Sequence, residues 1–144
     1  MNSYWDLVEP FWYEINIYDG PATFLETVSK APIKTGLLYA SHFCQSEVCN
    51  GGFDQFFWNN TGVLAPEALR GFRAIGQAKV ADLIEAAMRR LGPEYERDRE
   101  ARQALLEKVE DGFDDLDEQF FELIRSEAGG FESAADVYAV GSVA

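Results

Sequence analysis

The amino-acid sequence predicts an all-α fold, a single-domain bundle of about six to eight helices over residues 1–144. Apolar residues recur at spacings of three and four along most of the chain, which is the period of a helix packed on one face. No segment has the pattern of a confident β-strand. With 47% hydrophobic and 14% aromatic residues, a chain of 144 residues can bury an independent core.

The N-terminal region predicts short helices separated by proline and glycine. Tyr4–Tyr18 is rich in aromatic residues, and we expect Pro10 to open a helix there because proline suits the first helical turn. Asp19-Gly20-Pro21 predicts a turn. Phe24–Ser29 then predicts a short helix that ends before Pro32.

The next segment predicts two helices that meet at a glycine corner. Thr35–Cys49 has helical periodicity, and Asn50-Gly51-Gly52 should end it because these residues tolerate left-handed backbone. Phe53–Asn59 predicts the restart. Its apolar stripe consists of Phe53, Phe56 and Phe57.

The second half of the chain predicts five further helical segments. Proline favours a start near Pro66, and Asp98 is a candidate N-cap for a helix that runs to about Val109. The apolar spacing is clearest between Gln77 and Leu91. The segments are Pro66–Ile75, Gln77–Leu91, Asp98 to about Val109, Asp114–Ala128 and Ser133–Val140.

The charge is strongly negative and unevenly distributed. The formal net charge is −13, and residues 94–144 contain 15 acidic and 5 basic residues, a net of −10. Such a chain is a poor ligand for a phosphate backbone, so direct nucleic-acid binding is disfavoured. A basic protein partner is favoured on the same grounds.

Most of the clustered acids share one side of a predicted helix. On a helical wheel, Leu105–Ile124 places eight acids within roughly 160° and its apolar residues within a separate arc of about 100°. A break at Gly112 would change the phase of the second half, and the sequence leaves this continuity open. The acids are Glu107, Glu110, Asp111, Asp114, Asp115, Asp117, Glu118 and Glu122.

Two interpretations of these acids remain open. One is a solvated helix face that keeps the protein in solution. The other is an anionic surface that imitates nucleic acid. Carboxylates one helical turn apart lie about 5–6 Å from each other, and two rows halve that spacing, which approaches the phosphate pitch of one DNA strand.

The polar residues of the glycine corner have a structural and a functional interpretation. In the structural interpretation, Glu47 and Asn50 satisfy free backbone donors, while Gln55 and Asn59 bond a neighbouring loop. In the functional one, these residues form a polar site for a ligand or partner. We expect Trp58 to pack on another helix, with an interface anchor as the alternative. The corner comprises Glu47, Asn50, Gly51, Gly52, Gln55 and Asn59.

Catalytic, metal and cofactor sites are not predicted. His42, Cys44, Glu47 and Cys49 are metal-ligand types, but their spacing matches no zinc pattern. In a helix the two cysteines point about 140° apart, so we expect no disulfide between them and favour a reducing, cytoplasmic setting. No apolar run of membrane-spanning length and no secretory signal occurs, so no membrane association is predicted.

One long phrase resembles a known family. Residues 47–76, EVCNGGFDQFFWNNTGVLAPEALRGFRAIG, resemble the signature of the DNA mimic protein 19 family. Shorter similar pieces flank it at Ile17–Gly20, at Tyr95–Arg102 and at Leu116–Phe120, so that the resemblance extends from Trp5 to Tyr138. It implies an all-helical, acidic bacterial protein whose carboxylates occupy the DNA-binding surface of a helix-turn-helix-type transcription factor and so relieve repression.

The leading hypothesis is therefore a non-enzymatic DNA mimic that binds a basic DNA-binding protein through the eight acids. The first alternative is an immunity- or antitoxin-like interaction module that contacts its partner through Trp58, Gln55 and Asn59. The second alternative is an enzyme with a pocket near Glu47, Asn50 and His42. A homodimer is left open.

Overall fold

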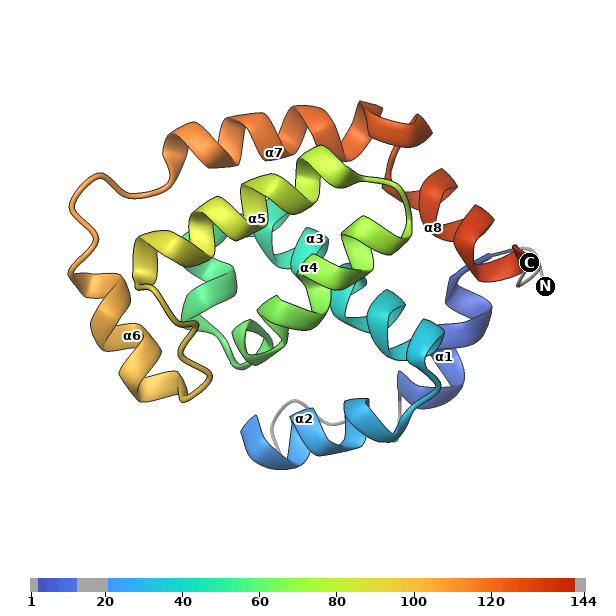
Figure 1. Ribbon diagram of the computed structural model, residues 1–144, viewed down its shortest axis with the longest axis horizontal. Coiled ribbons are helices and arrows are strands. Elements are labelled where there is room, and N and C mark those ends of the chain that lie inside the picture. Colours follow the sequence, from blue (N-terminus) through green and yellow to red (C-terminus); the bar gives the residue numbers. More distant parts are fainter. Residues whose placement is uncertain (1–2, 13–20, 142–144) are drawn as a thin grey trace.

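Eight α-helices and two short 3₁₀ helices form the computed structural model, which describes residues 3–12 and 21–141 (Figure 1). These residues contain no strand, so the predicted all-α class is confirmed. The predicted turn at Asp19-Gly20 lies outside the described residues. The elements are α1 (Trp5–Trp12), α2 (Pro21–Lys30), α3 (Ile33–Trp58), η1 (Asn60–Leu64), α4 (Ala65–Ala74), α5 (Ala78–Leu91), α6 (Arg99–Glu107), α7 (Asp114–Ser126), η2 (Glu127–Gly129) and α8 (Phe131–Val140).

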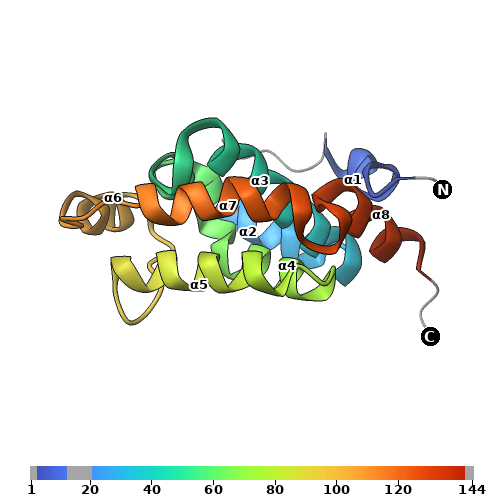
Figure 2. The ribbon, with the colours of Figure 1, turned by 90° about the horizontal axis from the view of Figure 1, so that it is seen from above.

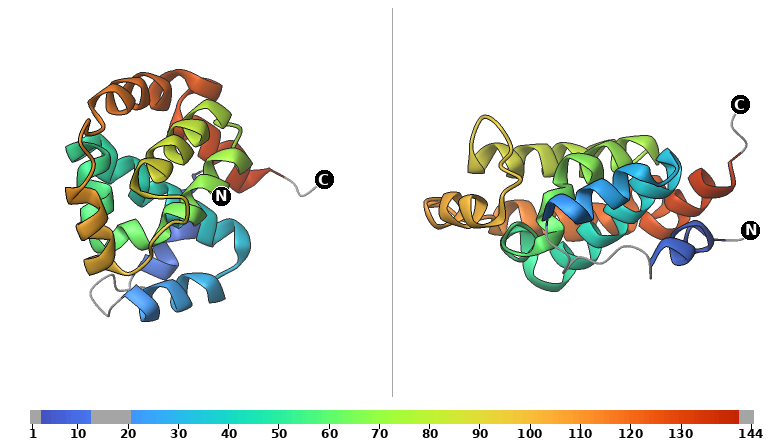
Figure 3. Two further views of the ribbon diagram at one scale, coloured as in Figure 1. Left: turned by 60° about the vertical axis from the view of Figure 1, so that its left-hand side comes forward. Right: turned by 90° about the horizontal axis from the view of Figure 1, so that it is seen from below.

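Helix α3 is the centre of the bundle. It contacts α1, α2, α4, α6 and α7, while α4 packs on α5 and α7 packs on both α3 and α5. Viewed from above, α7 runs over the seam between α3 and α5 (Figure 2). Helix α6 lies at one end of the molecule, and α1 and α8 lie at the other (Figure 3).

The predicted glycine corner is confirmed as a kink inside α3. Gly51 and Gly52 leave the helical conformation, with φ/ψ of −148°/18° and 77°/−179°. The second half of the helix therefore points in a new direction and carries its aromatic stripe into the core. Phe53, Phe56 and Phe57 are completely buried, as their spacing predicts.

Aromatic rings join this second half of α3 to α7. The Phe53 ring contacts the Phe120 ring edge-on at 5.5 Å between centroids, and the Phe57 ring contacts Phe113 at the same distance. Burying a phenylalanine side chain stabilises a fold by about 1.5–3 kcal/mol, and edge-on ring pairs add about 0.5–1.5 kcal/mol. These contacts hold the acidic helix α7 against the centre of the bundle.

A carboxylate from η2 secures α5 in the same region. Both carboxylate oxygens of Glu127 accept hydrogen bonds from first-turn backbone N–H groups of α5, from Lys79 at 2.8 Å and from Val80 at 3.0 Å. The buried Gln77 side chain donates to the Glu127 carbonyl oxygen at 2.8 Å. A negative side chain at a helix N-terminus satisfies free donors and complements the helix dipole.

The expected role of Pro10 is wrong. Pro10 lies inside α1, as the sixth of its eight residues, instead of opening a helix. A proline at this position lacks the N–H that would bond to the carbonyl oxygen of Asp6, so α1 forgoes one internal hydrogen bond. The helix starts earlier because Ser3 and Tyr4 supply its first carbonyl acceptors, to Asp6 and Leu7.

The continuity left open at Gly112 is resolved as a break. Helix α6 ends at Glu107 and α7 begins at Asp114, with Gly112 at a φ of 63° between them. In an uninterrupted helix these acids would lie in the middle, where the helix dipole does not stabilise negative side chains. The break puts Asp114, Asp115 and Asp117 in the first turn of α7, where negative side chains are stabilising.

Candidate functional site

The eight predicted acids lie on three parts of the structure. Glu107 ends α6, Glu110 and Asp111 lie in the turn at residues 108–113, and the remaining five belong to α7. A single stripe on one continuous helix is therefore wrong, because the break at Gly112 separates the two helix axes (Figure 1). All eight residues are exposed except Asp117, which is half-buried.

Helix α7 alone retains a regular row of carboxylates. Asp114, Glu118 and Glu122 follow one another at four-residue spacing and are all exposed. At 1.5 Å of rise per residue, successive carboxylates are about 6 Å apart along the helix. Arg125 closes the row with a contact of 3.4 Å to Glu122, and both side chains are more than 70% exposed. We call Asp114, Glu118 and Glu122 the α7 row.

Asp115 serves as an anchor on one side of α7. The Arg90 guanidinium donates to its two carboxylate oxygens at 2.8 and 2.6 Å, and to the Gly112 carbonyl oxygen at 2.8 Å. The same guanidinium lies 5.8 Å from the centroid of the Phe113 ring. The hydrogen bond from Arg90 lowers the pKa of Asp115 to about 2. This pair fastens the turn before α7 to the end of α5.

Asp117 serves as an anchor on the other side. Its Oδ1 accepts a hydrogen bond of 2.9 Å from the backbone N–H of Phe53, the first residue after the kink. Burial raises the pKa of Asp117, and the negative charges of Asp54 and Asp114 add to this effect, against the opposing hydrogen bond. The carboxylate thus caps the second half of α3 from a distance of 64 residues.

We expect Asp117→Asn to keep this cap and Asp117→Ala to lose it. The alanine variant should lose about 1 kcal/mol of unfolding free energy, the usual value of an N-cap. A carboxyl group with a raised pKa binds its proton more tightly in the folded state, so stability increases as the pH falls through that pKa towards the lower pKa of the unfolded chain. Chemical denaturation between pH 7 and pH 4 should show a smaller increase in Asp117→Asn than in the unaltered protein. Equal stability of the alanine variant would contradict the capping role.

The polar residues of the corner bond one another. Glu47 Oε2 accepts hydrogen bonds from the Gln55 amide at 2.6 Å and from the Asn59 amide at 3.1 Å. The Asn50 amide donates to Gln55 Oε1 at 3.2 Å. All of these hydrogen bonds join one side chain of the corner to another. The expectation that Glu47 and Asn50 cap backbone donors, and that Gln55 and Asn59 bond a loop, is therefore wrong. The network spans the kink and fixes the angle between the halves of α3.

A completely buried arginine lies beneath this corner. The Arg102 guanidinium donates to the carbonyl oxygens of Phe57 at 2.6 Å, Asn59 at 2.8 Å and Arg97 at 2.8 Å. It therefore satisfies the carbonyl groups at the C-terminal end of α3, where a cation is favoured by the helix dipole. The spacing contained a signal for its burial, since Arg102 precedes the buried Leu106 by one helical turn.

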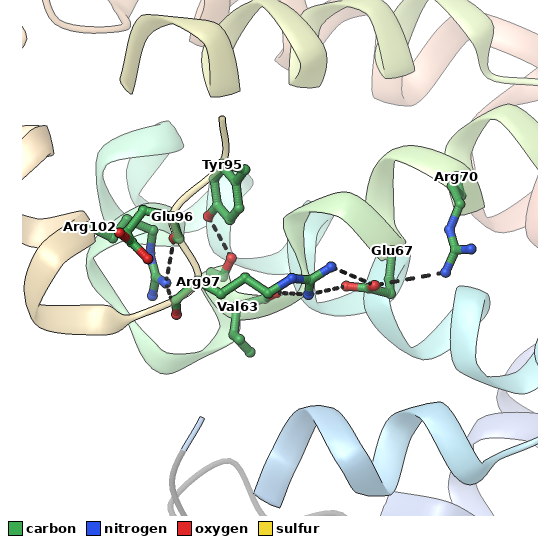
Figure 4. A network of polar contacts seen from close by, with 8 residues as sticks. Val63, Glu67, Arg70, Tyr95, Glu96, Arg97 and Arg102 are labelled. Atoms are coloured by element: carbon green, nitrogen blue, oxygen red, sulfur yellow. Dashed lines mark hydrogen bonds and ion pairs between the residues drawn. The ribbon is translucent and has the colours of Figure 1, made fainter. Parts of the chain in front are cut away.

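Two neighbouring side chains extend this contact to η1 and α4 (Figure 4). The Tyr95 hydroxyl donates to the Gly62 carbonyl oxygen at 2.5 Å. Arg97 donates to the Val63 carbonyl oxygen at 2.7 Å and to both carboxylate oxygens of Glu67 at 2.8 and 3.0 Å. The downstream pieces of the family resemblance are thus structural partners of the central phrase.

Trp58 lies in the wall of a surface groove and is 42% exposed. The side chain is therefore only partly covered, and the alternative of an interface anchor stays open. The groove has a volume of about 430 Å³ and lies between the second half of α3 and the end of α6. We call it the Trp58 groove. It is lined by Asp54, Gln55, Trp58, Asn59, Leu106 and Glu107.

His42 and the cysteines occupy a different part of α3. His42 Nδ1 bonds the Tyr4 hydroxyl at 2.9 Å, and burial lowers the pKa of His42. Cys44 is buried, Cys49 is exposed, and both thiols are free. Over residues 3–12 and 21–141, no group of three or more histidine, cysteine or acidic side chains is arranged to hold a metal ion. Within the same residues, every helix is too short or too polar to cross a membrane.

Comparison with known proteins places the sequence in a family. A family model described as DMP19-like protein matches residues 31–139. No curated protein and no solved structure matches the chain. The matched residues include the glycine corner, the buried Arg102 and the whole of α7.

Proposed function

Because the chain belongs to the family of DMP19-like proteins, we propose that it is a non-enzymatic DNA mimic that acts on a DNA-binding protein. Its target is the basic surface of a helix-turn-helix-type transcription factor or of another DNA-binding protein in the cytoplasm. Occupation of that surface relieves repression. The observation that carries this proposal is the exposed α7 row together with the acidic turn before it.

The spacing of the α7 row supports imitation of phosphate groups. Successive phosphates on one DNA strand are separated by about 3.4 Å along the axis, so every second phosphate recurs at about 7 Å. The row repeats at about 6 Å. A straight helix edge with this repeat can meet the lysine and arginine side chains that otherwise contact one DNA strand.

The turn before α7 adds a concave acidic surface at the start of the row. A hollow of about 680 Å³ is lined there by four acids, Glu110, Asp111, Asp114 and Asp115, together with Arg90, Lys108 and Val109. Within the described part of the chain, Glu110, Asp111 and Asp114 form no ion pair. The four acids outnumber the two basic side chains, and an excess of one sign of charge accelerates association with an oppositely charged partner.

Three of the eight acids have contacts that set them apart from the others. Asp115 and Asp117 hold the fold through Arg90 and Phe53, and Glu107 belongs to the Trp58 groove. We assign phosphate imitation to the other five. They are Glu110, Asp111, Asp114, Glu118 and Glu122.

Reversing the charge of the α7 row tests this proposal. We expect Asp114→Lys, Glu118→Lys and Glu122→Lys together to weaken capture of the DNA-binding partner at least tenfold, because attraction becomes repulsion over the whole row. The measurement is affinity capture from an extract of the native host at low salt. Elution with duplex DNA then shows that the captured protein uses its DNA-binding surface.

A matched variant controls for net charge. Glu94→Lys, Glu100→Lys and Glu132→Lys change three exposed acids on other elements by the same amount. We expect this variant to retain capture. Equal capture by both variants, or a captured protein that duplex DNA does not displace, would contradict DNA mimicry.

The second candidate function is the interaction module that binds through Trp58. The exposure of Trp58 favours it. Gln55 and Asn59 direct their amides to Glu47, which leaves Trp58 as the anchor to test. Loss of capture in Trp58→Ala, with capture retained when the α7 row is reversed, would favour this candidate over mimicry.

A further inference from the structure

We propose that the Trp58 groove binds an arginine side chain of the protein partner. The inference rests on the proposed function, because it names a specific contact for the basic protein that the α7 row attracts. The groove differs from that row in carrying an aromatic wall as well as carboxylates. It therefore recognises one side chain, whereas the row provides charge spread along a helix.

The shape of the groove comes from two helices. Asp54 and Trp58 lie four residues apart on one face of α3, with Gln55 beside them and Asn59 directly after the helix. The last turn of α6 supplies Leu106 and Glu107 opposite them. The volume of about 430 Å³ is at the lower end of the range for ligand sites, which suits a single long side chain.

The charges of the groove are complementary to a cation. Asp54 and Glu107 are exposed and form no ion pair among the described residues. Partial burial, and after it the negative charge of Asp114, raise the pKa of Asp54, so a cation placed beside this carboxylate would be favoured. The C-terminal dipole of α6 adds negative potential beside Glu107, and the one basic residue at this helix end is Lys108 at the C-cap, which does not line the groove.

The aromatic wall selects arginine over lysine. A planar guanidinium group stacks on an indole ring and is more weakly hydrated than an ammonium group. Tryptophan and arginine are also both enriched among the residues that contribute most to binding at protein interfaces. Two side chains of α6 hold the backbone at Trp58. The Trp58 carbonyl oxygen accepts hydrogen bonds from Arg99 and Gln103, both at 3.0 Å.

The groove can be tested with small probes and the full chain. The indole N–H signal of Trp58 is assigned by its loss in Trp58→Phe and is then followed by NMR during titration with N-acetyl-arginine amide. We expect a saturable shift with a dissociation constant in the millimolar range. N-acetyl-citrulline amide, which has nearly the same shape without the charge, should produce no saturable shift. N-acetyl-lysine amide should bind more weakly than the arginine probe.

Substitution of the two carboxylates provides the second measurement. Asp54→Asn with Glu107→Gln should weaken binding of the arginine probe at least threefold. Glu94→Gln with Glu132→Gln changes the net charge equally at exposed positions outside the groove and should leave binding unchanged. Circular dichroism confirms that both variants fold. Equal shifts with the citrulline probe, absence of a saturable shift, or equal weakening in the two variants would overturn the inference.

The outcome is independent of the test of DNA mimicry. If the α7 row controls partner capture but the arginine probe does not bind, the groove inference fails and the proposed function stands. If the arginine probe binds while charge reversal of the α7 row leaves partner capture unchanged, the mimicry proposal fails and the groove remains an arginine site.

Discussion

Replacing Arg102 with methionine is expected to lower the free energy of unfolding by at least about 3 kcal/mol. The substitution leaves the carbonyl oxygens of Phe57, Asn59 and Arg97 without their donors, and each buried, unsatisfied polar group costs about 1–3 kcal/mol. Methionine fills part of the space, so the loss reports mainly on hydrogen bonding. Urea denaturation followed by circular dichroism measures it.

Two companion variants test the explanation for Arg102. Arg102→Lys keeps the charge but cannot reach three carbonyl oxygens with a planar group, so we expect an intermediate loss. Arg89→Met removes an arginine that is 74% exposed and should change stability by less than about 0.5 kcal/mol. A loss below about 1 kcal/mol in Arg102→Met would show that the buried hydrogen bonds are not needed.

Replacing Gly52 with alanine is expected to cost about 2–4 kcal/mol of unfolding free energy. The φ/ψ of 77°/−179° at Gly52 belongs to a region that is accessible essentially to glycine alone. A Cβ atom there would also collide with Oδ2 of Asp117 and lie 3.0 Å from its Cγ. Strain in the backbone and displacement of the Asp117 cap therefore act together. Thermal and urea denaturation both measure the loss.

Gly112→Ala is the matched control for Gly52→Ala. Gly112 also has a positive φ, of 63°, but an added Cβ would have no neighbour within 4 Å. We expect it to cost about 1 kcal/mol, the backbone term alone. In an Asp117→Ala background, Gly52→Ala should cost less than in the unaltered protein because the collision is removed. Equal costs for the two glycine variants would mean that Asp117 does not restrain the kink.

The periodic features of the fold were predictable because they depend on neighbours in the sequence. The stripe of Phe53, Phe56 and Phe57, the glycine corner and the cap at Asp98 all involve residues within one or two helical turns. Asp98 accepts a hydrogen bond of 2.9 Å from the backbone N–H of Ala101, as the capping pattern predicts.

The structural contacts of Asp115 and Asp117 were not predictable from such local patterns. Asp115 meets Arg90 from 25 positions earlier, and Asp117 meets Phe53 from 64 positions earlier. A helical wheel assigns both to solvent because it contains no information about neighbouring helices. The role of Arg102 was missed for a related reason, since its acceptors are backbone carbonyls exposed by the end of a distant helix.

The double attachment of α7 has a consequence for how such a protein adapts. Arg90 holds Asp115 on one side of α7 and the Phe53 backbone holds Asp117 on the other, whereas the side chains of Asp114, Glu118 and Glu122 form no hydrogen bond or ion pair with another helix among the described residues. Under the proposed function, these outward side chains can be exchanged to suit a different partner while the contacts that hold α7 in place are kept. The position of the helix and the pattern of charge on its surface are then set by different residues.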